Sequence, residues 1–191
     1  GRWAMMEAAK TLLAWDERAG GDCGARLAVN LSAIQLQRDN IPRMVERVLD
    51  ETGLPGERFT LELTESALVA DPDRIAQTMH ALKALGTTLA MDDFGTGYSN
   101  LALLQKLPIN VLKMDRSFVT GMLADRDKIA IVRAILSLAQ ALGMKTTAEG
   151  VETYELAQTL AALGCSYGQG FLYSRPLEAD EAYARLMEDR A

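Results

Sequence analysis

Two adjacent aspartates, Asp92 and Asp93, end an apolar run in the stretch "TTLAMDDFGTG". Neighbouring carboxylates repel each other, and burying their charge is costly unless a positive group compensates for it. Taken alone, the pair is open to two interpretations, an ordinary solvated turn or the binding site of a cation. The choice depends on what the rest of the chain brings to the same place.

Each of the six predicted strands, including the one that ends in the two aspartates, has a polar side chain at or near its carboxyl end. In chain order these residues are Asn30, Glu62, Glu65, Asp92, Asp93, Lys113, Glu149 and Gln169. In a parallel barrel the strand ends meet at one mouth, where the active sites of this fold are built. Several carboxylates with one lysine are not the filling of an apolar core, so their convergence favours a cation site.

The elements that must position these residues alternate between strands and helices. Short apolar segments predict six strands, at residues 26–32, 58–65, 87–93, 110–115, 144–150 and 165–170. Helical periodicity predicts a first helix at the start of the chain and others at 41–53, 72–86, 127–143, 153–164 and 179–187. This alternation predicts an α/β fold with parallel strands, either an open doubly wound sheet or a barrel.

The composition limits the classes of partner. The 191 residues are 49% hydrophobic with a formal net charge of -6, which predicts one globular domain over residues 1–191 and excludes a platform for long nucleic acids. No apolar run reaches the roughly 20 residues of a membrane span, so we expect no membrane contact by this domain. Cys23 and Cys165 form no paired motif, which indicates reduced thiols and a cytoplasmic location, with any membrane anchor in another domain of the parent protein.

The candidate ligands are rich in oxygen, which suits Mg²⁺ or Mn²⁺. No thiolate lies near them and His80 falls within a predicted helix, so a zinc site is not expected. Carboxylates that hold two ions about 3.5–4 Å apart fit the cleavage of a phosphodiester. Because successive strand residues point to opposite faces, we expect Asp93 to share a site with Asp92 only if the strand ends there.

Six motifs closely resemble those of EAL-type cyclic-di-GMP phosphodiesterases: "VNLS", "LELTES", "DDFGTGYSNL", "LKMDRSF", "AEGVET" and "GQGFLYSRPL". They occur in the family's order, and the resemblance covers about residues 1–177. It implies a modified TIM (β/α)8 barrel of which this chain holds about six strands. It also implies that cyclic-di-GMP is hydrolysed to linear pGpG with two Mg²⁺ or Mn²⁺ ions.

The same resemblance implies a role for each polar residue. The metal ligands would be Asn30, Glu62, Asp92, Asp93 and Glu149. Lys113 and Glu149 would position the attacking water, and Glu65 would hold the loop Gly95-Thr96-Gly97 in place. The residues that contact or support the substrate would be Gln169, Glu152 and Asp115.

The family is named for a Glu-Ala-Leu segment whose Glu is a metal ligand, and the resemblance begins after that segment. We therefore expect the sequence to be an N-terminally truncated domain, with the segment and about two strands upstream of Gly1. Hydrolysis by the fragment itself would then be impaired. The resemblance also implies a homodimer and regulatory domains in the parent protein.

Two other functions remain open from the sequence. The chain could be a catalytically inactive receptor that binds cyclic-di-GMP, although the visible ligands and the glycine loop are intact and favour the enzyme. Carboxylates and a lysine at strand ends also fit metal-assisted proton abstraction of the enolase type, which needs a lysine or histidine as base. Considered alone, Lys113 could equally be a structural ion-pair partner of the acids.

Overall fold

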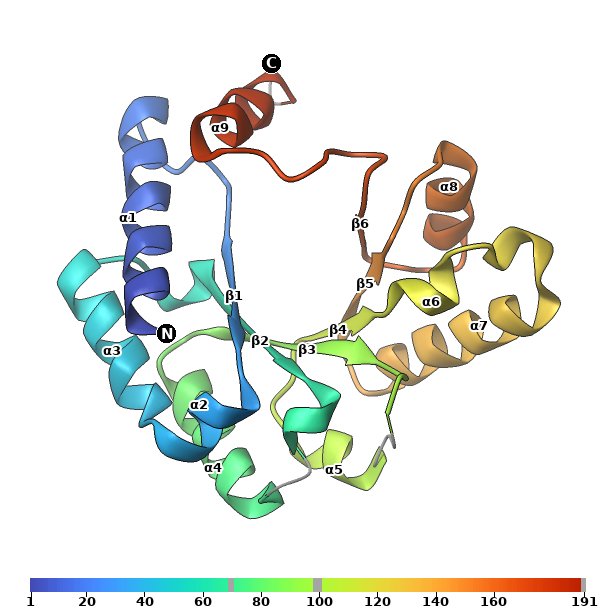
Figure 1. Cartoon of the computed structure of the whole chain (residues 1–191), viewed down its shortest axis with the longest axis horizontal. Coiled ribbons are helices and arrows are strands. Elements are labelled where there is room, and N and C mark those ends of the chain that lie inside the picture. Colours follow the sequence, from blue (N-terminus) through green and yellow to red (C-terminus); the bar gives the residue numbers. More distant parts are fainter. Residues whose placement is uncertain (69–70, 98–100, 190–191) are drawn as a thin grey trace.

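The computed structural model describes residues 1–68, 71–97 and 101–189. Six parallel strands form one sheet in sequence order: β1 Leu27–Leu31, β2 Phe59–Thr64, β3 Thr88–Phe94, β4 Val111–Met114, β5 Lys145–Glu149 and β6 Tyr167–Gln169. A doubly wound sheet reverses its strand order at a switch point, whereas this one does not. The fold is α/β with a curled, barrel-like sheet (Figure 1), which confirms the prediction of a TIM-barrel type.

The helices lie around the outside of the curled sheet (Figure 1). The α-helices are α1 Arg2–Ala19, α2 Ala33–Arg38, α3 Ile41–Thr52, α4 Pro72–Ala84, α5 Leu101–Lys106, α6 Arg116–Val119, α7 Arg126–Ala141, α8 Tyr154–Ala162 and α9 Ala179–Glu188. Within the described ranges there are also short 3-10 helices: η1 Gly56–Arg58, η2 Glu65–Leu68 and η3 Met122–Ala124. The last helix packs against the carboxyl end of α1: Arg18 pairs with Asp180 of α9 at 2.6 Å and lies over the ring of Tyr183.

Alternation along the strands separates the core from the polar face of the sheet. In β2, Phe59, Leu61 and Leu63 are buried, while Glu62 lies on the opposite face. The register keeps the polar residues together: Asn30 pairs with Glu62, and Glu149 with Gln169. One face of the sheet is therefore apolar, and the other carries the candidate ligands.

Candidate active site

Lys113, on β4, lies at the centre of a cluster of carboxylates that come from three other strands of the sheet. Its Nζ atom is 2.9 Å from Glu62 Oε2 on β2, 3.0 Å from Asp92 Oδ1 on β3 and 2.8 Å from Glu149 Oε1 on β5. Only 7% of the lysine side chain is exposed. Four residues that the sequence analysis placed at strand ends are thus in direct contact.

The three carboxylates determine the charge of this lysine. Burial alone would lower the pKa of Lys113, but its hydrogen bonds with Glu149, Glu62 and Asp92 outweigh burial and raise that pKa above its ordinary value. A lysine that keeps its proton is a donor and a counter-charge, and it does not serve as a base. This arrangement gives no support to the enolase-type alternative.

Asp93 reaches the same site as Asp92, but for a different reason from the one expected. The strand does not end at Asp93, since β3 continues to Phe94. Instead Asp93 has a left-handed backbone, with φ 54, and the register with β4 shifts between Met91 and Phe94. This irregularity in the strand turns consecutive side chains toward one place, as β-bulges do beside many active sites.

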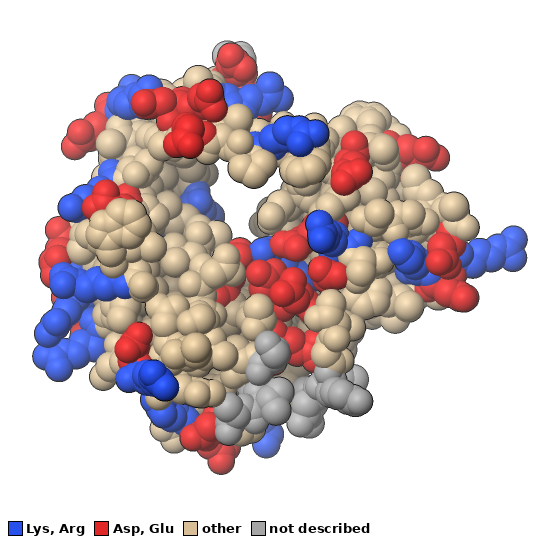
Figure 2. All heavy atoms as spheres, in the orientation of Figure 1, with Lys and Arg blue, Asp and Glu red and all other residues tan. Residues whose placement is uncertain are grey.

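Asp92, Asp93 and Glu149 each offer a carboxylate oxygen, and these oxygens all lie within 4.8 Å of one another. Burial and the nearby charges of Asp92 and Asp115 raise the pKa of Asp93. Hard oxygen donors at this separation fit Mg²⁺ or Mn²⁺, and an added cation would relieve their mutual repulsion. Figure 2 shows acidic side chains gathered near the middle of the face that it presents.

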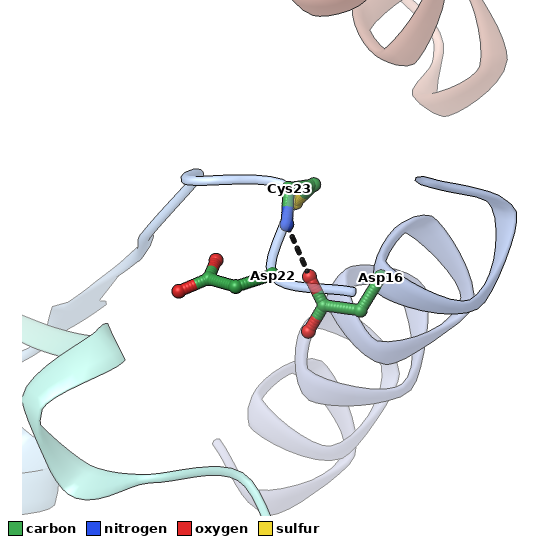
Figure 3. A group of neighbouring side chains, drawn as sticks. All are labelled: Asp16, Asp22 and Cys23. Atoms are coloured by element: carbon green, nitrogen blue, oxygen red, sulfur yellow. Dashed lines mark hydrogen bonds between the residues drawn. The ribbon is translucent and has the colours of Figure 1, made fainter. Parts of the chain in front are cut away.

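A second acidic group, Asp16, Asp22 and Cys23, lies where α1 leads into β1 (Figure 3). This group already holds a cation, because Arg58 pairs with both oxygens of Asp16, at 2.5 and 3.0 Å, and lies 3.3 Å from Asp22. The guanidinium also donates to the carbonyl of Ala25. The group is therefore a structural ion pair in which an arginine already balances the carboxylates.

Glu65, in η2, faces the glycine loop that follows β3. Its Oε2 accepts a hydrogen bond of 3.1 Å from the backbone N–H of Gly95, and a side chain at Gly97 would press on its carboxylate at 3.3 Å. Its Oε1 is buried with no hydrogen-bond partner among the described residues. Residues 98–100 of the motif "DDFGTGYSNL" lie outside the described part of the chain.

A pocket of about 650 Å³ opens directly beside the acidic cluster. The predicted residues Glu149, Glu152 and Gln169 all line it. Asp115 precedes the lining residue Arg116 in the chain and is the N-cap of α6. Its side chain accepts a hydrogen bond from Ser117 N–H, and the hydrogen bonding with Ser117 holds the pKa of Asp115 below its ordinary value. Asn30 lies further along the sheet, on β1 beside Glu62, and His80 is an exposed residue of α4.

Sequence reasoning missed several residues of this pocket, among them Lys128 and Phe171. Lys128, on α7, donates to the carbonyls of Ser117 and Thr120 and so fastens the end of α6. No motif marks this lysine, because its role depends on how two helices pack. The sequence did contain one indication of α6: Asp115, which precedes "RSFV", is a residue type that favours the N-cap of a helix.

None of the helices in the described part of the chain has the length and apolar character that crossing a membrane requires. Both cysteines are free, Cys23 buried and Cys165 partly buried.

Comparison with known proteins places these features in a family. The sequence model described as the EAL domain matches residues 1–176. The bifunctional diguanylate cyclase/cyclic di-GMP phosphodiesterase MucR of Pseudomonas aeruginosa is 39% identical over 186 residues, which are 97% of this chain and 27% of MucR. The oxygen sensor protein DosP of Escherichia coli is 37% identical over 181 residues, 95% of this chain and 22% of DosP. The chain thus spans about a quarter of the length of these curated relatives.

Solved structures agree in fold. The EAL domain of Mycobacterium smegmatis DcpA has a TM-score of 0.89 at 40% identity, covering 98% of this chain and 84% of that one. The MucR phosphodiesterase in complex with c-di-GMP has a TM-score of 0.89 at 39% identity, covering 95% of this chain and 73% of that one. Since both the sequence model and these folds match almost the whole length, the chain belongs to the EAL domain family.

Proposed function

We propose that the protein containing this chain hydrolyses one phosphodiester bond of cyclic-di-GMP, giving linear pGpG, with two Mg²⁺ or Mn²⁺ ions. The observation that carries this proposal is the group of carboxylates around Lys113 beside a pocket of about 650 Å³. A relative named as a cyclic di-GMP phosphodiesterase, 39% identical, supports the choice of substrate.

The metal ions would be held by Asp92, Asp93 and Glu149, together with Glu62 and Asn30. The first three already bring oxygens within 4.8 Å of one another, and Glu62 lies in the same cluster through Lys113. Bound ions of this kind make water a better nucleophile and offset the charge that develops on the phosphate and the leaving oxygen. Mg²⁺ and Mn²⁺ favour such oxygen donors, so the donor set fits both.

The pocket is where we place the dinucleotide. Gln169 and Glu152 offer hydrogen-bonding groups at its wall, and Arg116 brings a positive charge toward an anionic ligand. Asp115 would act through α6, because its side chain caps the short helix that carries Arg116. These assignments agree with a ligand that is both anionic and rich in hydrogen-bonding groups.

The reaction needs a water oxygen to bond to phosphorus while the bond from phosphorus to the 3′-oxygen breaks. The 3′-oxygen leaves with a proton and becomes the free hydroxyl of pGpG. Lys113 and Glu149 would orient the water, with the lysine as a donor because it keeps its proton. Glu65 would fix the glycine loop, and hence Asp93, through its hydrogen bond with Gly95.

Incubation with cyclic-di-GMP and Mn²⁺, followed by chromatography of the nucleotides, tests the proposal. We expect pGpG to appear with the parent protein, and to be lost in Glu149→Gln, which keeps the size of the side chain but removes its charge. Lys145→Met, an exposed change at the opposite end of the same strand, is the matched control. Absence of product at every metal concentration, with retained cyclic-di-GMP binding, would instead identify a receptor.

The wider setting is also proposed. The curated relatives are about four times longer than the matched region, and one is named as an oxygen sensor, so we propose that regulatory domains accompany this one in the parent protein. A homodimer and a cytoplasmic location remain predictions. Size-exclusion chromatography of the parent protein, and fractionation of cells that express it, would test them.

A further inference from the structure

The ammonium group of Lys113 lies between three carboxylates of the acidic cluster. We propose that Lys113 is a built-in counter-ion, which neutralises the carboxylates in the metal-free protein and must be displaced from them when metal binds. This inference rests on the metal site proposed above, and it makes one lysine the regulator of how tightly that site takes metal.

The ammonium group of Lys113 has as many carboxylate partners as it has N–H donors. A lysine has three N–H donors and no acceptor. Three carboxylates lie at 2.8 to 3.0 Å from Nζ, one each from Glu149, Glu62 and Asp92. Two of these residues, Asp92 and Glu149, also belong to the trio whose oxygens lie within 4.8 Å of one another. The lysine and a metal ion would therefore compete for the same carboxylates.

The second acidic group shows what a permanent counter-ion looks like in this protein. Arg58 is held by the two oxygens of Asp16 and by the backbone carbonyl of Ala25, so its place does not depend on carboxylates alone. The ion pairs of Lys113 Nζ among the described residues are with three carboxylates, and no backbone carbonyl is among its hydrogen-bond partners there. Lysine is also a point charge on a flexible stem, whereas arginine is a rigid fork. Lys113 is thus the counter-ion that can be displaced.

Two consequences follow from competition between like charges. In the absence of metal, Lys113 prevents the carboxylates from repelling one another and stabilises the folded sheet. When a divalent ion arrives, the ammonium repels it at close range in a partly buried site, where such repulsion is strong. Lys113 therefore stabilises the empty site and weakens metal binding.

Lys113→Met tests both consequences, because methionine keeps an unbranched side chain of similar reach without the charge. With a chelator present, we expect a lower melting temperature than in the unsubstituted protein. In a calorimetric titration with Mn²⁺ alone, we expect tighter binding, on the order of tenfold, as loss of a close charge repulsion predicts. Lys145→Met removes an exposed lysine from the neighbouring strand and should change neither the Mn²⁺ affinity nor the thermal shift on Mn²⁺ addition.

Each outcome decides the question. If Lys113→Met is unfolded with chelator but folds when Mn²⁺ is added, the metal has replaced the missing charge, which supports the inference. Failure to fold under both conditions, or an Mn²⁺ affinity that is unchanged or weaker, would overturn it. If the unsubstituted protein binds Mn²⁺ and Lys113→Met binds it equally, only this inference is lost. If neither protein binds Mn²⁺, the proposed metal site is lost as well.

Discussion

Asp93 combines two properties that are rare in a strand, a positive φ of 54° and a raised pKa. A non-glycine residue in the left-handed region carries backbone strain, and such strain is concentrated at functional sites. The raised pKa has burial as its largest cause, followed by the charges of Asp92 and Asp115. The ionised carboxylate of Asp93 is therefore unfavourable in the folded, metal-free protein.

We predict that Asp93→Asn stabilises the metal-free protein at neutral pH. Asparagine tolerates the left-handed backbone and removes the unfavourable charge. Because the pKa of Asp93 is higher in the folded state than in the unfolded state, the aspartate protein loses stability as pH rises through that interval. Urea unfolding in chelator, from neutral to acidic pH, should show the advantage of the variant disappearing below the ordinary aspartate pKa of about 3.9.

Asp115→Asn is the matched comparison, since the hydrogen bond with Ser117 lowers the pKa of Asp115. That substitution should destabilise the protein at neutral pH, and its effect should also fade in acid. An Asp93→Asn variant that is less stable than the parent at neutral pH would contradict this account of the bulge.

At the scale of elements, one ion pair adds to the apolar packing that holds α1 on the sheet. Arg58, just before β2, pairs with Asp16 near the end of α1, and the side chains are only 10% and 17% exposed. This pair lowers the pKa of Asp16 from 3.8 to about 2, mainly through the hydrogen bond with Arg58. A lowered carboxyl pKa means that the pair stabilises the fold above pH 3.8 and that this contribution is lost as pH falls toward about 2.

Asp16→Asn should therefore lower the free energy of unfolding by about 2 kcal/mol at neutral pH, as the size of the pKa shift implies. The deficit should shrink as the pH falls through the interval between 3.8 and about 2. Urea unfolding at several pH values measures it. Asp22→Asn is the control: its side chain is 68% exposed and lies 3.3 Å from Arg58, so its effect should be small. Equal losses in both variants would show that Arg58 is not held chiefly by Asp16.

The long elements could be predicted from the sequence, and the short ones could not. All six strands lie within two residues of their predicted bounds, because apolar runs ending in polar residues are a local signal. The helices α2, α5 and α6 were missed, since four to six residues carry too little periodicity. For α2 a signal did exist: Ser32 and Gln35 form a capping box.

Some features of the candidate active site could likewise be predicted from the sequence, and others could not. That Glu62, Asp92, Lys113 and Glu149 would converge followed from strand ends meeting at one mouth. An ion pair between Lys113 and the acids is one of the two roles that the sequence leaves open for this lysine. The bulge at Asp93, the number of carboxylates that Lys113 contacts and the role of Lys128 could not be predicted, because each depends on distances between elements. The sequence pattern predicted which residues belong to the site, whereas their contacts depend on how the elements pack.

At the scale of the whole molecule, sequential pairing leaves two outer strands. Among the described residues β1 pairs only with β2, and β6 only with β5 (Figure 1). Near β6 three aromatic side chains are about half exposed: Tyr167, Phe171 and Tyr173. Unpaired strand edges with exposed apolar side chains are the usual route to association between chains.

We therefore expect this 191-residue chain to self-associate through its open strands. Sedimentation velocity should show an average mass that increases with protein concentration. Tyr167→Lys places a charge on the outer strand β6, where lysine discourages edge pairing, and should shift the protein toward monomer. Tyr154→Lys makes the same change at a 70% exposed position on α8, away from the sheet, and should leave association unaltered. A monomer at every concentration, or an equal response to both variants, would show that the outer strands are not the contact.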